Sequence, residues 1–264
     1  MVTKPRAPIV SLLANAGYPF LVFLSLFALS SVSTNFVYYF SSADGRADMV
    51  ADMKANNPSM LHLNNTEGLI TQEVYLKAPI TVQGFHLAPV LIWSIAFPLQ
   101  LSARIRRLSL KLHRWIGRLA LLCSLSLSIS GILICFWNVA YSVEADSEIT
   151  TFFTFDKGSY ALSVWFLFTN WKAFTSARAR KITEHKRWVL RHAAGGYSVM
   201  VMRIFMVIYT GVAEAIDWEF KTDVNMKQLF FGWSLWAGSI VNISTMEFYL
   251  LRTNTNETFE KRPK

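Results

Sequence analysis

Long apolar runs, separated by short polar segments, are the feature of this sequence that most restricts its fold. Most runs are close to 20 residues long, the length of helix that crosses a hydrocarbon core of roughly 30 Å. The apolar residues are continuous and do not alternate with polar ones, which disfavours a membrane β-barrel. Only 16% of the 264 residues are charged, less than in a typical soluble domain, and 53% are hydrophobic. The sequence therefore predicts an all-α, polytopic transmembrane helix bundle, a single domain over residues 1–264 with about six spanning helices, at 18–40, 81–102, 114–140, 158–174, 185–211 and 228–251.

The charged residues are sorted between the two sides that this arrangement creates. One side takes the N-terminus, the segments at 103–118 and 172–191 and the C-terminus, and it collects 19 of the 26 Lys and Arg residues. The other side holds 13 of the 17 acidic residues, several of them in a polar segment at 41–80. Because an excess of Lys and Arg marks the cytoplasmic side, both termini are predicted to be cytoplasmic, with a polar tail at 252–264. The same sorting accounts for the net charge of +9 without a nucleic-acid partner.

Two basic, histidine-bearing stretches open predicted spans. The first contains His113, Arg114, Gly117 and Arg118, and the second contains His185, Arg191, His192, Gly195 and Gly196. His192 lies about two turns beyond His185, and Arg203 lies about three turns beyond His192, so the three share one helix face. An arginine this deep in an apolar span is costly in lipid and is expected to face the protein interior. We expect the two stretches to meet, with His192 and Arg203 beside a polar cavity.

Histidines on two separate helices at similar depth suggest one b-type haem near the cytoplasmic face, used for electron transfer across or along the membrane. In this hypothesis His113 and either His192 or His185 are the haem-iron ligands. The supporting residues would be Arg114, Arg118, Arg191 and Arg203 for the propionates, and Gly195 and Gly196 to leave room for the macrocycle. Three further candidate residues lie within predicted spans, namely His86, Gln100 and Glu247. Gln100 could meet Arg114 or Arg118, and Glu247 could pair with Arg203 or an arginine of the basic stretches.

Several alternatives fit the same residues. Arg203 and His192 could bind the solute of a small-anion or metabolite carrier or channel, or the protein could be a non-catalytic scaffold or assembly subunit of a membrane complex. Arginines and histidines at the boundary could simply bind anionic lipid headgroups. A zinc site at the histidines is possible, but no cysteine or carboxylate ligand accompanies them in the sequence. Cys123 and Cys135 are expected to be packed thiols. Asn64 fits an N-glycosylation acceptor if its side faces a secretory lumen, and the sequence leaves open which membrane holds the protein.

The order of these residues resembles the predicted-membrane-protein family catalogued as domain-of-unknown-function family 2306. The resemblance covers about residues 80–215, and it is carried by His86, by the sequence His113-Arg114-Trp115-Ile116-Gly117-Arg118, and by His185-Lys186-Arg187-Trp188-Val189-Leu190-Arg191. The family's pattern has methionine where this chain has Val189. The resemblance implies a helical membrane architecture and candidate residues, and no reaction. The bundle is more loosely similar to cytochrome b561 and ferric-reductase-like haem bundles, which place two histidines at each membrane face. Since this chain has only His86 near the outer face, that similarity implies a single inner haem.

Overall fold

A computed structural model describes residues 17–30, 80–137, 153–216 and 224–260, and all the regular structure within these ranges is helical. The helices are Gly17–Ser30, the π-helix η2 (Ile80–Leu87), α5 (Ala88–Leu101), α6 (Ala103–Leu108), α7 (Leu110–Phe136), α9 (Phe155–Arg178), α10 (Ile182–Ala215) and α11 (Val224–Glu260). The predicted all-α fold is therefore confirmed. The predicted spans at 81–102, 114–140, 158–174, 185–211 and 228–251 each correspond to a described helix, with shifted ends.

The first basic segment is itself helical, which the sequence analysis did not predict. Ser102 takes an extended backbone conformation that ends α5, and Ser109 does the same at the end of α6. The Ser109 hydroxyl then accepts a hydrogen bond from the Leu112 amide at 3.2 Å, so that it caps the first turn of α7. These two serine breaks turn the chain from α5 into α7.

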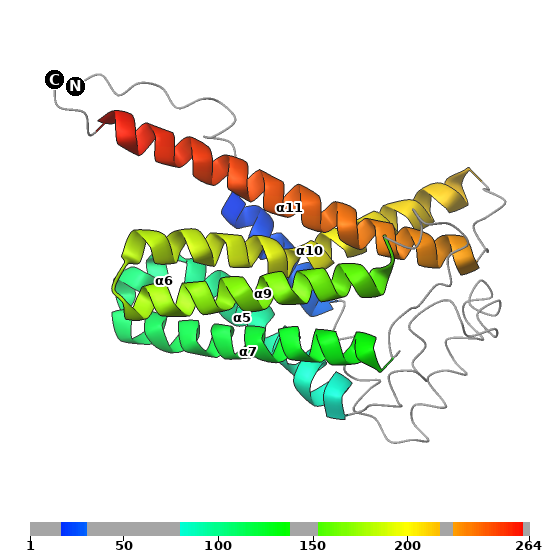
Figure 1. Ribbon diagram of the computed structural model, residues 1–264, viewed down its shortest axis with the longest axis horizontal. Coiled ribbons are helices and arrows are strands. Elements are labelled where there is room, and N and C mark those ends of the chain that lie inside the picture. Colours follow the sequence, from blue (N-terminus) through cyan, green and yellow to red (C-terminus); the bar gives the residue numbers. More distant parts are fainter. Residues whose placement is uncertain (1–16, 31–79, 138–152, 217–223, 261–264) are drawn as a thin grey trace.

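The second basic segment is a tight reversal between α9 and α10. α9 ends at Arg178, and Arg180 adopts a left-handed backbone with φ of 58°. The Lys181 amide donates to the Ser176 carbonyl at 3.0 Å, which closes the turn before α10 begins at Ile182. The reversal makes α9 and α10 antiparallel neighbours (Figure 1).

The bundle pairs α5 with α7 and α9 with α10, and α11 packs along α10 and α9 (Figure 1). The core between the two pairs is aromatic. Trp93 stacks on Phe97 with ring centroids 4.5 Å apart and leans against Tyr197 at 5.0 Å. Burial of these rings accounts for much of the favourable packing in the interior.

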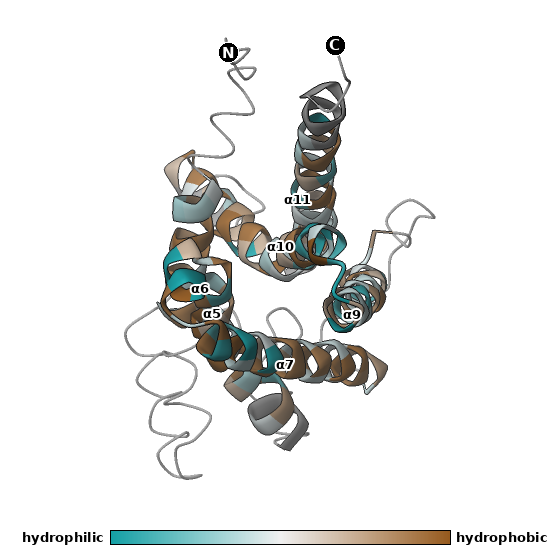
Figure 2. Ribbon diagram, turned by 90° about the vertical axis from the view of Figure 1, so that its left-hand side faces the viewer, coloured by the Kyte–Doolittle hydropathy of each residue, from teal (hydrophilic) through white to brown (hydrophobic). Residues whose placement is uncertain are grey.

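Three described helices are long and apolar enough to cross a membrane, over Gly84–Leu101, Leu110–Phe136 and Ile182–Ala213. The protein is therefore an integral membrane protein, as predicted. The number of six spans and the cytoplasmic termini stay predictions. Figure 2 shows hydrophilic residues gathered at α6 and the adjoining end of α7, with hydrophobic colour along much of the helices' length.

Some predicted features differ from the structure or fall outside the described residues. α11 continues through polar residues as far as Glu260, so most of the predicted polar tail at 252–264 is helical. Asn64 and nearly all of the 41–80 segment lie outside the described residues, as do residues 261–264.

Candidate functional site

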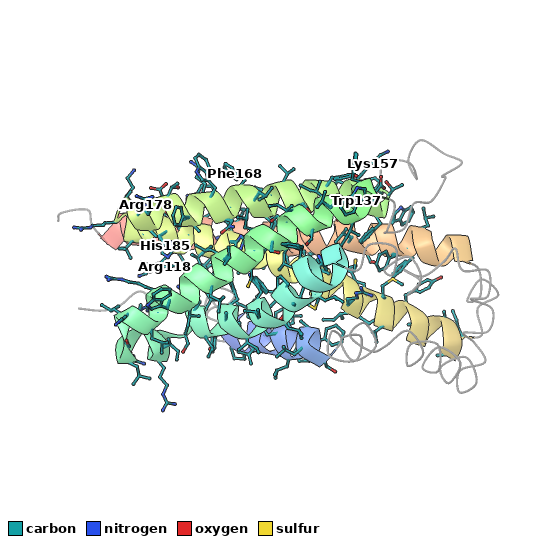
Figure 3. All side chains as sticks on the ribbon, turned by 90° about the horizontal axis from the view of Figure 1, so that it is seen from below. Arg118, Trp137, Lys157, Phe168, Arg178 and His185 are labelled. Carbon is teal, nitrogen blue, oxygen red and sulfur yellow. The ribbon has the colours of Figure 1, made fainter. Side chains whose placement is uncertain are left out.

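The two histidine-bearing stretches lie at the same end of the bundle, as predicted. Figure 3 shows Arg118, Arg178 and His185 at one end and Trp137 and Lys157 at the other. The end that carries Arg118 and His185 is referred to below as the basic end, and the other as the opposite end. Along the bundle between them, the described histidines occupy three levels.

The first level, at the basic end, joins Gln100 of α5, His113 of α7 and His185 of α10. Gln100 Nε2 lies 3.2 Å from His113 Nε2, and His185 Nδ1 donates to the Ala173 carbonyl of α9 at 2.8 Å. Gln100 was predicted to meet an arginine, and it bonds His113 instead. Its amide also packs against Gly117, where a Cβ would lie 2.8 Å from Gln100 Nε2. The glycine therefore lets the amide reach the imidazole.

The charges around His113 are basic. The side chains that act on it electrostatically are those of Arg106, His185 and Arg114. His185 is among the charges that act on His113, in agreement with the place of the two predicted stretches at one end of the bundle. Arg118 lies over the Trp115 ring, with its guanidinium carbon 5.1 Å from the ring centroid.

The second level is His192, which is fully buried. Its Nδ1 is 2.9 Å from Thr169 Oγ1 on α9, and its Nε2 is 2.8 Å from Ser124 Oγ on α7. Its ring stacks on Phe166 with the centroids 3.9 Å apart and the planes 9° apart. Ser124 Oγ also accepts from Trp93 Nε1 on α5 at 2.9 Å. One imidazole thus ties α5, α7, α9 and α10 together through hydrogen bonds.

Both hydroxyls beside His192 also lie within hydrogen-bond distance of carbonyls of their own helices. Ser124 Oγ is 2.8 Å from the Ala120 carbonyl, and Thr169 Oγ1 is 2.9 Å from the Trp165 carbonyl. A neutral imidazole donates from one nitrogen and accepts at the other, so one of the two hydroxyls directs its proton to the ring. Neither ring nitrogen is open to a metal.

The residues beside His192 do not fit a haem. A Cβ on Gly196 would lie 2.7 Å from the Trp93 ring, and one on Gly195 would lie 3.0 Å from Trp165, so indole rings fill the space that the glycines leave. Arg191, expected at a propionate, instead forms a bidentate ion pair with Glu247 of α11. His192 as an iron ligand is thus at odds with the structure, because protein groups already occupy its nitrogens and its surroundings.

The Arg191–Glu247 pair confirms that Glu247 bonds an arginine of the basic stretches. Arg191 Nε lies 2.5 Å from Glu247 Oε1, and Nη2 lies 2.7 Å from Oε2. Arg203, the other predicted partner, lies over the Phe231 ring of α11 at 5.6 Å. Neither His192 nor Arg203 is among the residues that line the cavity described below.

The third level is a cavity of about 130 Å³ toward the opposite end, with His86 in its wall. His86 Nδ1 lies 3.0 Å from Ser130 Oγ of α7, and the Arg203 charge acts on the His86 ring. The cavity is lined by apolar side chains, by Gly131, Gly195 and Gly196, and by the serines Ser94, Ser128, Ser159 and Ser163. A cavity of this size holds a molecule like benzene, which is much smaller than a porphyrin.

The serines of the cavity were missed by sequence reasoning. Ser124 and Ser128 are four residues apart and Gly131 follows three later, so they lie on one face of α7. Such a spacing of small residues is typical of close packing between membrane helices. It also marks the polar wall of a cavity, because the hydroxyls are the polar groups of an otherwise apolar span.

Comparison with known proteins supports the membrane assignment and supplies no activity. No curated protein and no solved structure matches the chain. A family model described as "Predicted membrane protein (DUF2306)" matches residues 84–233, which include the α5–α7 pair, the α9–α10 pair and all three histidine levels. Because the match spans more than half of the chain, this protein belongs to that predicted-membrane-protein family.

Proposed function

We propose that this membrane protein is a carrier or channel for a small anion, and that the solute binds in the cavity beside His86. The observation that supports the proposal is a cavity of about 130 Å³, walled by an imidazole and serine hydroxyls, between helices that are otherwise apolar. Polar groups inside a membrane span are costly unless they serve a cavity or a partner.

The chemistry of the wall favours an anion. None of the described residues that line the cavity is acidic. Serine hydroxyls can turn to donate, and the positive charge of Arg203 acts on His86 at the cavity wall. The volume suits a halide, nitrate or a short carboxylate, which are all within the size of benzene.

The basic end of the bundle closes the path in this conformation. A layer of bonded and aromatic side chains lies between the cavity and the Gln100–His113 level. It consists of the hydrogen-bonded network around His192, the Phe166 ring stacked on His192 and the Phe97 ring tilted against it. Transport therefore requires these aromatic rings to move, which is the behaviour of a carrier with a gate.

Anion flux into liposomes that contain the purified protein tests the proposal. His86→Ala should lower the flux about tenfold or more, since it removes a polar group of the cavity wall worth roughly 1.5–3 kcal/mol in a hydrogen bond. Arg203→Gln should also lower the flux, because the Arg203 charge acts on His86. Arg252→Gln is the matched control, because Arg252 is an exposed arginine over Phe248 of α11, away from the cavity. Unchanged flux in both the His86 and the Arg203 variant, with folded protein, would overturn the proposal.

Haem-dependent electron transfer is the second candidate, and the proximity of His113 and His185 favours it. With His192 engaged on both nitrogens, these two are the imidazoles that a single inner haem would have to use. A visible spectrum of protein expressed with haem supplied distinguishes the two candidates. Absence of a Soret band removes the haem candidate and leaves the anion proposal unaffected.

A further inference from the structure

The Gln100–His113 pair at the basic end has hydrogen-bonding capacity that the described residues do not meet. Gln100 Oε1 and His113 Nδ1 are both buried, and neither has a hydrogen-bond partner among the described residues. Buried polar atoms are nearly always satisfied, by protein, water or a ligand. The two atoms belong to side chains already bonded to each other through Gln100 Nε2 and His113 Nε2.

The unmet capacity is one donor and one acceptor, whichever way the amide is turned. If the Gln100 NH₂ donates to His113 Nε2, the ring proton is on Nδ1. The His113 Nδ1–H then lacks an acceptor and the Gln100 carbonyl lacks a donor. If the amide is reversed, Nδ1 becomes the unmet acceptor and the NH₂ the unmet donor. Satisfying both atoms takes one hydrogen-bond acceptor and one donor.

The charge around the pair is positive. Arg106, Arg114 and His185 act on His113, and residues 80–137 contain no acidic residue. Two acidic residues of the adjoining helices near this end, Glu184 and Glu247, are paired with Lys181 and Arg191. Water molecules could hydrogen-bond Gln100 Oε1 and His113 Nδ1. Water would not neutralise the positive charges of Arg106 and Arg114, whereas an anion would.

We propose that Gln100 and His113, with Arg106 and Arg114, form a binding site for a phosphomonoester group. A monoester at neutral pH carries about −1.5 to −2 charges and is partly protonated, so it supplies both P–O⁻ acceptors and a P–OH donor. A phosphodiester has no P–OH and cannot meet the unmatched acceptor. Arginine is the side chain best suited to phosphate oxygens.

Two sources share this chemistry, a lipid of the phosphatidic acid type and free inorganic phosphate. The surroundings favour the lipid. Leu112 and Trp115, next to His113 on α7, are large apolar side chains that are 45% and 59% exposed. In a bilayer this surface contacts acyl chains, which brings a headgroup to the level of His113. The site lies at the other end of the bundle from the His86 cavity, so the inference is separate from the proposed anion transport.

Titration calorimetry on the purified full-length protein in detergent tests the inference with three ligands. Short-chain phosphatidic acid should bind at least about tenfold more tightly than short-chain phosphatidylmethanol, a diester whose headgroup has no O–H donor. Inorganic phosphate binding as tightly as phosphatidic acid would assign the site to free phosphate. Equal binding of the two lipids, or no binding of any of the three, would overturn the inference.

Substitutions at His113 separate ligand binding from folding. The amide of asparagine can take the place of imidazole Nδ1, and the longer amide of glutamine can take the place of Nε2. His113→Gln should keep the contact to Gln100 and the thermal stability, yet weaken phosphatidic acid binding about tenfold. His113→Asn should retain more of the binding. If the glutamine variant binds as the wild type does, Nδ1 has no role in binding.

Arginines of α6 supply a matched control. Arg106→Gln should weaken binding of phosphatidic acid, because its charge acts at His113. Arg104→Gln removes the same charge from the same short helix, at an exposed position that is not among the residues acting on His113. Equal losses in the two variants would indicate general attraction of anionic lipid to a basic surface and would overturn the specific site.

Discussion

At the scale of single residues, His192 is a structural histidine. An imidazole buried in an apolar span is unstable unless both nitrogens are satisfied, and here Ser124 and Thr169 satisfy them. The ring also stacks on Phe166, which orients it. Ser124 takes part in two hydrogen bonds of this network, because it accepts from Trp93 Nε1 and bonds His192 Nε2.

Removing the Ser124 hydroxyl should therefore be more harmful than its size suggests. Ser124→Ala leaves the Trp93 N–H and His192 Nε2 buried without a hydrogen-bond partner, at a cost of about 1–3 kcal/mol each. We expect the variant to have a clearly lower unfolding temperature in detergent, measured by tryptophan fluorescence. Thr175→Val is the control, since Thr175 is half-buried and bonds only carbonyls of its own helix. A Ser124 variant as stable as the control would contradict the network.

At the scale of elements, the ion pair between Arg191 and Glu247 fixes α11 against α10. Close packing helps, because a Cβ on Gly238 would lie 3.0 Å from the Ser198 carbonyl of α10. The carboxylate accepts two parallel hydrogen bonds from one guanidinium, the geometry in which arginine pairs are strongest. Both side chains are partly exposed, at 21% and 34%, so the pair is screened in part.

Glu247→Gln should destabilise the protein by about 1–2 kcal/mol, because it removes the charge from a bidentate, half-buried pair. Chemical unfolding in detergent measures the effect. The control is Glu184→Gln, whose pair with Lys181 is exposed and 3.7 Å long, and which should change the stability by less than about 0.5 kcal/mol. Equal effects of the two substitutions would mean that the α10–α11 pair adds nothing beyond a surface contact.

At the scale of the whole molecule, the structure places both basic segments at one end of the bundle (Figure 3). A membrane orients such a protein by its Lys and Arg residues, with the basic side facing the cytoplasm. Cys123 and Cys135 are both buried, so labels that react with exposed thiols should find little background in the native protein.

Single cysteines at Arg104, Arg180 and Lys157, all exposed positions, test this orientation. A membrane-impermeant thiol reagent should label the cysteines at 104 and 180 from the cytoplasmic side and the cysteine at 157 from the other side. Labelling of 104 and 157 from the same side would contradict the orientation and, with it, the predicted placement of the termini.

The sequence by itself determined the fold class, the approximate positions of α5, α7, α9, α10 and α11, and the shared end of the two basic segments. These follow from local properties, namely the length of apolar runs and the cost of leaving charge in lipid. It also predicted an arginine partner for Glu247, and it left open whether that partner is Arg203 or an arginine of the basic stretches.

Only the tertiary structure decided which polar groups meet. Helical spacing placed His185, His192 and Arg203 on one face, yet their neighbours come from helices far away in the sequence. Hydroxyls of Ser124 and Thr169 occupy both nitrogens of His192, Trp93 fills the space beside Gly196, and Gln100 reaches His113 across Gly117. A periodic pattern specifies the direction in which a side chain points, whereas its partner depends on how the helices pack against one another.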